Sequence, residues 1–316
     1  MADLTWGHPP RYTARELTDL LEDHKPASKR LYPTAEQTAI IEAGPEPLLV
    51  VAGAGSGKTH TMTDRVIWLI ANGYVRPEEV LGVTFTRKAA GELEARINNA
   101  IERLATRTDL DLGFEAADIG QATVTTYHSY ANSLVADHGL RIGVEPDSRL
   151  IGEAESYQLI TEVAREHDSD IDLSDVHSED LMTSIADDVR DRPLSSTIKA
   201  IKKLAGDCAE HLVEPDEVTA ALAEMFAFGQ SLPVGKSMTS STKSLFAGLK
   251  LRTKIADMVS DYLELKRTNN VMDYGDLVRY AAMIATQLPE VRAIEREKYQ
   301  IVLLDEFQDT SHAQLK

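Results

Sequence analysis

Residues 52–59 read Ala-Gly-Ala-Gly-Ser-Gly-Lys-Thr and follow a short apolar run directly. Glycines let the chain fold back so that successive backbone N–H groups point at one anion, and the positive end of a following helix adds to the attraction. In such a loop Lys58 reaches the β- and γ-phosphates of a nucleotide, and the Thr59 hydroxyl binds Mg²⁺. The sequence therefore predicts a phosphate-binding loop made of Ala52, Gly53, Ala54, Gly55, Ser56, Gly57, Lys58 and Thr59.

The loop departs from the strict phosphate-loop pattern at its first position, where Ala52 stands in place of glycine. The apolar run before the loop and the helical pattern that begins near His60 still favour a phosphate site, because such loops join a strand to a helix. The alternative is a glycine-rich turn without a ligand. Lys58 and Thr59 argue against that alternative.

Two adjacent carboxylates, Asp305 and Glu306, follow the apolar run 301–304 near the end of the sequence. Carboxylates at the carboxyl end of a parallel strand lie where such sheets bind ligands. We expect Asp305 to hold Mg²⁺ directly or through water, Glu306 to orient and deprotonate an attacking water, and Gln308 to sense the γ-phosphate. Alone, the pair is more typical of a solvated turn, but together with Lys58 it predicts nucleotide hydrolysis.

Short strands and helices in alternation must hold these residues. Apolar and β-branched runs predict strands over residues 48–52, 80–85, 122–126 and 300–305. Helical periodicity follows them, which indicates an α/β fold with a parallel sheet covered by helices. Between about residues 127 and 270 the strand signal is absent, and the predicted helices are 153–166, 194–205, 215–228 and 242–267. The sequence therefore predicts a helical insert in an α/β core.

The composition excludes several classes of protein. A formal net charge of −18 argues against indiscriminate binding to nucleic acid, although residues 236–267 carry 7 basic and 3 acidic side chains. That basic helix is either a solvated face or a surface that touches DNA. The single cysteine, Cys208, cannot form an internal disulfide, and no stretch is long and apolar enough to span a membrane. We therefore expect a cytoplasmic protein without a membrane partner.

Four further motifs accompany the loop and the carboxylates along the chain. They are Pro33-Thr34 with Glu36 and Gln37, Thr84-Phe85-Thr86-Arg87-Lys88-Ala89-Ala90, Thr125-Thr126-Tyr127-His128-Ser129-Tyr130, and Asp273-Tyr274-Gly275-Asp276-Leu277. With residues 305–310, Asp-Glu-Phe-Gln-Asp-Thr, they resemble in order the motifs of UvrD/Rep/PcrA-type superfamily 1 DNA helicases. Several motifs in the right order are far more specific than any one of them.

The resemblance implies a RecA-like parallel sheet of a P-loop NTPase with an inserted all-helical subdomain. The domains implied are an N-terminal extension (1–29) docked loosely on the core, the first part of the ATP-binding core (30–130), the helical insert (131–270) and the second part of the core (271–316), truncated after the Asp-Glu motif. In this family a second RecA-like domain follows, with arginines for the γ-phosphate and an aromatic for the adenine. We therefore expect this piece alone to bind ATP weakly and to hydrolyse it poorly.

The resemblance also implies roles for individual residues. Gln37 would read the adenine, and His60 would contact the nucleotide beside the loop. The implied cofactors are ATP and Mg²⁺, with Thr59 and Asp305 as metal ligands. The residues implied to face DNA are Phe85, Thr86, Arg87, Tyr127 and His128. Core packing is the competing interpretation for the two aromatic rings, and a capping or buried structural role is the competing interpretation for the histidine.

Members of the family move 3′ to 5′ along single-stranded DNA and use ATP to do so. Arg87 in place of asparagine and Gly275 in place of aspartate resemble a subset of actinobacterial helicase-nuclease subunits, which implies work in DNA repair or recombination. The implied partners are single-stranded or duplex-junction DNA and a protein subunit. Two alternatives stay open: a nucleotide-binding regulatory or scaffolding module of a DNA-processing complex, and a small-molecule kinase, which would leave the motifs around Thr84, His128 and Gln308 unexplained.

Overall fold

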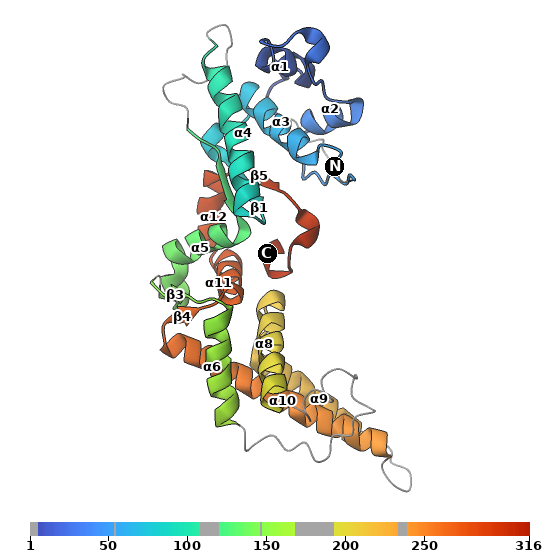
Figure 1. The fold of residues 1–316 in the computed structure, drawn as a ribbon, viewed down its shortest axis with the longest axis vertical. Coiled ribbons are helices and arrows are strands. Elements are labelled where there is room, and N and C mark those ends of the chain that lie inside the picture. Colours follow the sequence, from blue (N-terminus) through green and yellow to red (C-terminus); the bar gives the residue numbers. More distant parts are fainter. Residues whose placement is uncertain (1–5, 54, 108–119, 146, 168–192, 233–238) are drawn as a thin grey trace. The chain divides into compact units, whose positions relative to one another are not determined.

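The computed structural model describes residues 6–53, 55–107, 120–145, 147–167, 193–232 and 239–316. The chain divides into two compact units (Figure 1). Unit 1 comprises residues 1–130 and 289–309, and unit 2 comprises residues 131–288 and 310–316. Each unit is therefore built from two separate stretches of the chain.

Unit 1 contains a three-stranded parallel sheet. Its middle strand is β1 (Val80–Thr84), with β2 (Thr123–Thr126) on one side and β5 (Ile301–Leu304) on the other. The register pairs Thr84 with Thr126 and Val83 with Leu304, so the three strands end at the same edge of the sheet. β1 is buried along its whole length, as expected for the middle strand of a parallel sheet. Three of the four predicted strands are confirmed.

The prediction of a fourth strand over residues 48–52 is wrong. This segment has no regular secondary structure, and Leu48, Leu49 and Val51 are 47%, 69% and 87% exposed. An apolar run forms a strand only where a neighbouring strand takes up its backbone N–H and C=O groups. Among the described residues no strand pairs with this segment, and none lies on the second side of β5.

Unit 1 also contains helices. They are α1 (Ala14–Leu21), α2 (Ala35–Ile41), α3 (Lys58–Ala71), α4 (Arg87–Ala105) and α12 (Pro289–Lys298). α4 packs against β1 and β2. Its buried side chains recur every three or four residues and face the core, as in an amphipathic helix: Leu93, Ile97, Ile101 and Leu104.

The N-terminal extension is packed more closely than we predicted. Thr13 caps α1, and Glu16 completes a capping box with it. Ala14 and Leu17 of this helix are buried in the same apolar core as α3 and α4. The expectation of a loosely docked extension is therefore wrong, because a helix of two turns can bury one face without showing a long periodic pattern.

Unit 2 is mainly helical. The first turn of α5 (Tyr127–His138) belongs to unit 1, and the helix continues into unit 2. The other helices are α6 (Glu153–Glu166), α8 (Pro193–His211), α9 (Pro215–Ser231), α10 (Ser240–Thr268) and α11 (Tyr274–Gln287). α6, α8 and α10 share an apolar core, and α9 packs along α10 (Figure 1). The four predicted helices are confirmed, although α8 continues six residues beyond its predicted end at residue 205.

The predicted absence of strands between residues 127 and 270 is wrong in one detail. β3 (Arg149–Leu150) pairs in parallel with β4 (Val271–Met272). Strands of two residues are too short for a period-two pattern to reveal them. Within the part of the chain that the structure describes, no helix combines the length and the apolar character needed to cross a lipid bilayer.

Candidate functional site

Three motif segments leave the sheet of unit 1 at the same edge. Phe85 follows β1, Tyr127 follows β2 and Asp305 follows β5. The Asp305 N–H donates to the carbonyl oxygen of Val83 at 2.9 Å, which extends the pairing of β5 with β1 by one residue. Parallel sheets bind ligands beyond the carboxyl ends of their strands. This edge is therefore the candidate functional site.

The predicted phosphate loop leads directly into α3. Gly55 and Gly57 have φ angles of +77° and +84°, which glycine adopts without the steric cost that a side chain brings. Gly57 is the N-cap and Lys58 is the first helical residue. The N–H groups in the first turn of a helix have no partner within the helix, so this terminus suits an anion. Ala54 lies outside the described residues.

Lys58 and Gln37 both touch the loop. The Lys58 ammonium donates to the carbonyl oxygens of Ala52 at 3.0 Å and Gly53 at 3.3 Å. Phosphate oxygens are stronger acceptors than carbonyls, so a bound nucleotide would compete for this ammonium. Gln37 Nε2 donates to the Ser56 carbonyl at 3.2 Å, so the side chain implied to read the base lies beside the phosphate loop.

Thr59 and His60 lie in the first turn of α3. The Thr59 carbonyl accepts a hydrogen bond from the Thr63 hydroxyl at 2.9 Å. The exposed His60 ring lies 3.6 Å from the Asp64 carboxylate one turn along the helix. Burial raises the pKa of Asp64, and the neighbouring His60 opposes that rise. The His60 ring is thus oriented along the helix, toward Asp64.

The carboxylates after β5 differ in burial and backbone conformation. Asp305 is buried, and its Oδ1 accepts the Glu306 N–H at 3.1 Å. Glu306 is exposed and has a φ of +53°, a left-handed conformation that costs a residue other than glycine about 1–3 kcal/mol. Gln308 donates to the Glu306 carboxylate. Such strain persists where the surrounding structure enforces it, and it is common at active sites.

Asp305 and Thr59 carry donors of the kind that suits Mg²⁺. This ion takes oxygen ligands, usually one or two carboxylates together with phosphate oxygens and waters. Asp305 offers a carboxylate and Thr59 a hydroxyl at the helix terminus. Among the described residues, no group of three or more His, Cys, Asp and Glu side chains converges as a metal site. One carboxylate and one hydroxyl fit a magnesium ion whose other ligands would be phosphate oxygens and waters.

The implied DNA-facing residues differ in exposure. Phe85 is half-buried, and its ring meets the buried Tyr127 ring at a centroid distance of 4.8 Å. Thr86 is exposed and caps α4 by accepting the Ala89 N–H at 3.1 Å, and Arg87 is exposed in the first turn of that helix. Among these implied DNA-facing residues, the exposed ones are therefore polar or basic, and Phe85 adds a partly exposed aromatic ring.

Burial shifts the pKa values of two of these residues. Desolvation raises the pKa of the Tyr127 hydroxyl, and the Asp305 carboxylate adds to the rise. Desolvation lowers the pKa of His128. Tyr127 also packs with Leu81 and Val83, as the core-packing interpretation predicts. Its hydroxyl oxygen is buried and has no hydrogen-bond partner among the described residues.

The Asp273-Tyr274-Gly275-Asp276-Leu277 motif lies in unit 2 and forms the start of α11. Asp273 is the N-cap and Asp276 completes a capping box. The buried Lys266 ammonium donates to Asp273 Oδ2 at 2.9 Å and to Asp276 Oδ2 at 2.6 Å. These contacts give the motif a local structural role, as an ion cluster that fixes the end of α10 to the start of α11.

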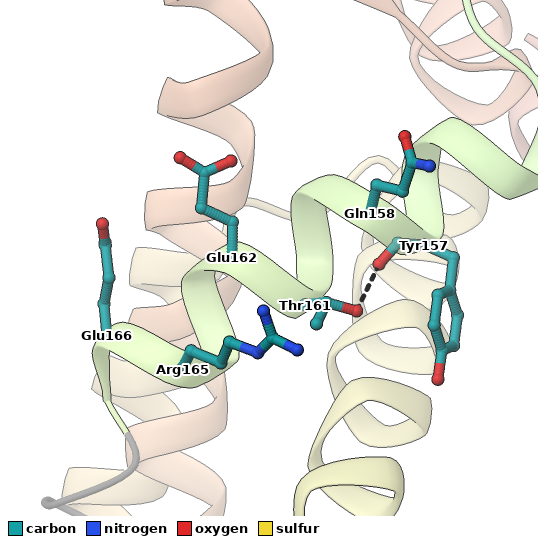
Figure 2. A pocket seen from close by; sticks show the side chains of 6 residues that line it. All are labelled: Tyr157, Gln158, Thr161, Glu162, Arg165 and Glu166. Carbon is teal, nitrogen blue, oxygen red and sulfur yellow. Dashed lines mark hydrogen bonds between the residues drawn. The ribbon is translucent and has the colours of Figure 1, made fainter.

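A surface hollow of about 590 Å³ lies along α6 in unit 2 (Figure 2). Its lining side chains all come from that one helix: Tyr157, Gln158, Thr161, Glu162, Arg165 and Glu166. Thr161 Oγ1 donates back to the Tyr157 carbonyl at 2.7 Å. None of the motif residues lines this hollow, so it is not the site that the sequence predicts.

The sequence did not single out two buried polar residues, Arg65 within α3 and Asn72 at its C-cap. Both flank the apolar run Val66–Ala71 of α3 and use their side chains to bind backbone groups of other segments. A sequence signal could have revealed them. A cationic residue and an amide stand at the two ends of a helical stretch that is otherwise fully apolar.

Comparison with known proteins places these features in one family. The model of the UvrD/REP helicase N-terminal domain matches residues 33–316. The chain is 26% identical over 278 residues to the ATP-dependent DNA helicase PcrA of Bacillus subtilis, which covers 88% of this chain and 29% of PcrA. It is 25% identical over 280 residues to the ATP-dependent DNA helicase UvrD1 of Mycobacterium tuberculosis, with coverage of 88% and 29%.

A third relative is DNA helicase II of Rickettsia typhi, which is 26% identical over 270 residues, covering 85% of this chain and 32% of the relative. The chain thus spans about 29–32% of the length of these relatives. The family match covers the phosphate loop, the sheet and both carboxylates. The chain therefore belongs to the UvrD/REP helicase N-terminal domain family.

Proposed function

We propose that this chain is the first ATPase domain of an ATP-dependent DNA helicase that moves 3′ to 5′ along single-stranded DNA. The observation that carries the proposal is the common edge at which β1, β2 and β5 end. There the aromatic pair Phe85 and Tyr127 lies one residue beyond two strands, and Asp305 lies one residue beyond the third. Because Asp305 shares this edge with Phe85 and Tyr127, ATP hydrolysis near Asp305 would change the position of the two rings that we expect to face DNA.

The ATP-binding half of the proposal rests on the loop and its neighbours. Backbone N–H groups at the start of α3 would hold the phosphates, with the Lys58 ammonium on the β- and γ-phosphates. Gln37, already against the loop, would hydrogen-bond the base. Bound Mg²⁺ would draw charge from the phosphate oxygens, and Thr59 and Asp305 are the residues that would hold it.

The hydrolytic step in this proposal uses Glu306. Its carboxylate would orient the attacking water and accept its proton, and Gln308 would keep the carboxylate in place. Asp305 accepts a backbone N–H whereas Glu306 accepts the Gln308 amide, so the two carboxylates already have different partners. Gln308 would also sense the γ-phosphate.

The DNA-binding half of the proposal rests on which motif side chains are exposed to solvent. The partly exposed Phe85 ring would stack on a base, with Tyr127 packed behind it. The exposed Thr86 and Arg87 at the start of α4 would hold phosphates of the strand, together with His128. This arrangement supports single-stranded DNA or a duplex junction as the partner.

We propose that residues 131–288 form a mainly helical insert in a RecA-like core that resumes at residue 289, so the end predicted from the sequence, residue 270, falls short of the end of unit 2. Unit 2 interrupts unit 1 along the chain, which supports an insertion.

In the complete protein, arginines from another domain would stabilise the transition state, a contribution of roughly 10³–10⁵ in rate. This chain alone is then a weak ATPase. We assign the complete protein to cytoplasmic DNA repair or recombination, with a partner subunit.

The test is ATP binding and hydrolysis with and without single-stranded DNA, measured for this chain and for the complete gene product. We expect both to bind Mg·ATP and only the complete product to show hydrolysis stimulated by DNA. Lys58→Ala should abolish Mg·ATP binding in both. Micromolar affinity in that variant would overturn the site, and hydrolysis that DNA never stimulates would favour a nucleotide-binding regulatory or scaffolding module instead.

A further inference from the structure

α2 is too short to hold its own position. It has seven residues, and an isolated helix of this length is not stable in water. Gln37 stands in its first turn and reaches the Ser56 carbonyl of the phosphate loop at 3.2 Å. The distance between this side chain and the loop therefore depends on what fixes the rest of α2.

Arg65 fixes the opposite end of α2. Its Nη1 donates to the carbonyl oxygens of Ile40 at 2.8 Å, Ile41 at 3.2 Å and Ala43 at 2.9 Å, and its Nη2 donates to that of Gly44 at 2.8 Å. Arg65 is only 9% exposed and lies on α3, the helix that begins at the phosphate loop. One guanidinium thus satisfies carbonyls at the end of α2 and links them to the loop's own helix.

The N-terminal segment, residues 6–32, holds the same end of α2 from another direction. Trp6 Nε1 donates to the Ala43 carbonyl at 3.2 Å, which is also an acceptor for Arg65. The Ala14 N–H, at the start of α1, donates to Glu42 Oε1 at 2.7 Å. A carboxylate at a helix N-terminus is a favourable partner, because the helix dipole attracts it. Glu42 is the C-cap residue of α2, so the two helices meet end to end.

The N-terminal segment is anchored on α3 as well. Asn72 Oδ1 accepts the backbone N–H groups of Arg11 at 2.6 Å and Tyr12 at 2.8 Å. Trp68 Nε1 donates to the Tyr12 carbonyl at 2.8 Å. Asn72 is fully buried and Trp68 nearly so. The segment therefore bridges α2 and α3 with directed hydrogen bonds.

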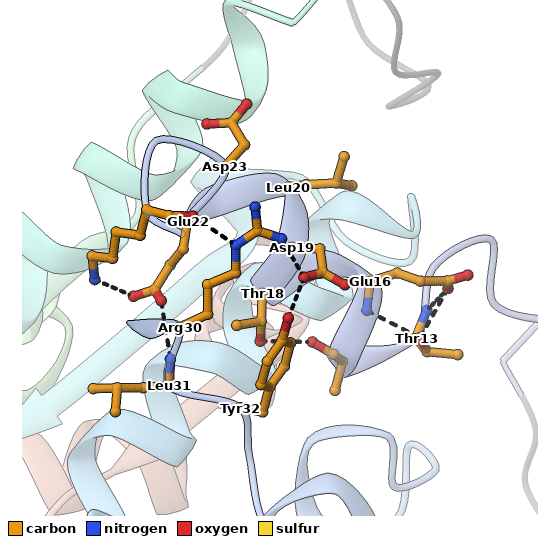
Figure 3. Close-up of polar contacts among 12 residues, drawn as sticks. Thr13, Glu16, Thr18, Asp19, Leu20, Glu22, Asp23, Arg30, Leu31 and Tyr32 are labelled. Carbon is orange, nitrogen blue, oxygen red and sulfur yellow. Dashed lines mark hydrogen bonds and ion pairs between the residues drawn. The ribbon is translucent and has the colours of Figure 1, made fainter. Parts of the chain in front are cut away.

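The segment is also tied to the chain that enters α2. The Arg30 guanidinium and the Tyr32 hydroxyl both donate to Asp19 Oδ1 of α1 at 2.5 Å (Figure 3). Tyr32 directly precedes the family match, which begins at residue 33. These contacts within the segment fix the residues that lead into α2, while Trp6 and Ala14 contact its far end.

We propose that residues 6–32 and Arg65 form a brace that positions Gln37 for the base of a nucleotide bound at the loop. The proposal rests on the proposed function of the loop as an ATP site. Phosphate binding depends on α3 and the loop, whereas base recognition depends on α2. Loosening the brace should therefore weaken the preference for ATP over GTP more than it weakens binding of the triphosphate.

The test uses Glu42, whose carboxylate joins α2 to α1. Affinities of the chain for Mg·ATP and Mg·GTP are measured by competition against a fluorescent ATP analogue. Glu42→Ala should lower the ratio of the two affinities by about 2–10-fold, the range for one lost hydrogen bond. Glu42→Gln keeps a side-chain oxygen and should keep the ratio. Gln37→Ala gives the ratio of ATP to GTP affinity that is expected when the side chain that recognises the base is absent.

Two further variants make the test independent of folding. Trp6→Phe removes the donor to Ala43, keeps an aromatic ring beside Tyr74 and should also lower the ratio. Asp23→Asn breaks the 2.8 Å ion pair of the same segment with Arg107, which lies just beyond α4, and should leave the ratio unchanged. An unchanged ratio in folded Glu42→Ala and Trp6→Phe proteins would overturn the brace. Absence of ATP binding or of any preference in the parent chain would instead contradict the proposed nucleotide site.

Discussion

Phe85 and Tyr127 face each other across the ends of two paired strands, with ring centroids 4.8 Å apart and planes inclined by 45°. The two rings have different surroundings. Tyr127 is 8% exposed and packs on the side chains of β1, whereas Phe85 is half-buried. Only Phe85 therefore presents part of its ring to a ligand, and Tyr127 supports it from behind.

Phe85→Ala should weaken binding of single-stranded DNA. Stacking of one base on an aromatic side chain contributes about 1–3 kcal/mol, so the dissociation constant should rise roughly 5- to 150-fold. The measurement is fluorescence anisotropy with a labelled oligothymidine at fixed salt concentration. Phe228→Ala, at a ring that is 67% exposed in unit 2, is the matched control and should leave the affinity unchanged. Equal affinity of the Phe85→Ala variant and the parent would contradict the stacking role.

Tyr127→Phe separates the ring from its hydroxyl. The hydroxyl oxygen is buried without a hydrogen-bond partner among the described residues, and removal of such a group is neutral or stabilising. We expect unchanged DNA affinity and an unchanged or higher free energy of unfolding, measured by urea denaturation. A clear loss of stability would show that the hydroxyl has a partner in solution.

Glu306→Gln should bind Mg·ATP like the parent and lose hydrolysis. The amide keeps the size of the side chain but cannot accept a proton, and general base catalysis is worth about 10²–10⁴ in rate. The assay is phosphate release by the complete gene product with saturating DNA, beside binding of a fluorescent ATP analogue. Hydrolysis at the parent rate would assign the base to another residue.

The sequence predicted the elements whose pattern is local. α6 follows the predicted range 153–166 from end to end, and β1, β2 and β5 lie within predicted strands, because alternation and helical periodicity depend only on near neighbours. The strand predicted over residues 48–52 was wrong because strand formation depends on residues that are distant in the sequence. The apolar character of residues 48–52 suits a strand, but strand formation needs a partner that a local pattern does not reveal.

The candidate site was predictable where motif residues follow strands. Asp305 and Phe85 were each placed at a strand end by the apolar run before them, and a parallel sheet brings such ends together. The contacts of Arg65 and Trp6 with Ala43 were not predictable, because they join segments far apart along the chain through backbone carbonyls that have no sequence signature. The ion pairs of Lys266 were missed for a related reason, since no pattern indicated that it faces inward.

His128 should make stability depend on pH. Burial lowers its pKa in the folded state, so between that value and the ordinary pKa of about 6.5 the unfolded chain binds more protons than the folded chain. The free energy of unfolding should therefore fall as the pH drops through about 6.5. His128→Gln should show a smaller fall in urea titrations between about pH 8 and about pH 5.5. Parallel curves for parent and variant would contradict the shift.

Lys266→Met should destabilise unit 2. Lys266 is 3% exposed and its ammonium joins Asp273 and Asp276, so its loss leaves the buried Asp276 carboxylate and the partly buried Asp273 carboxylate without a cation. Breaking a buried pair in this way costs about 3–5 kcal/mol. The measurement is urea denaturation near neutral pH. Lys203→Met is the control, because its 2.6 Å pair with Asp207 is exposed and such pairs contribute about 0–1 kcal/mol.

The same variant has a distinctive pH dependence. Burial already raises the pKa of Asp276 in the parent, while Lys266 opposes the rise. Without the lysine, Asp276 should take up a proton at higher pH, and a neutral carboxyl is far less costly to bury than a charged one. The loss of stability in Lys266→Met should therefore shrink as the pH falls from about 8 to about 5. Asp276→Asn in the same background should recover part of the loss at neutral pH, and no recovery would show that packing of the lysine stem, rather than its charge, stabilises this end of α10.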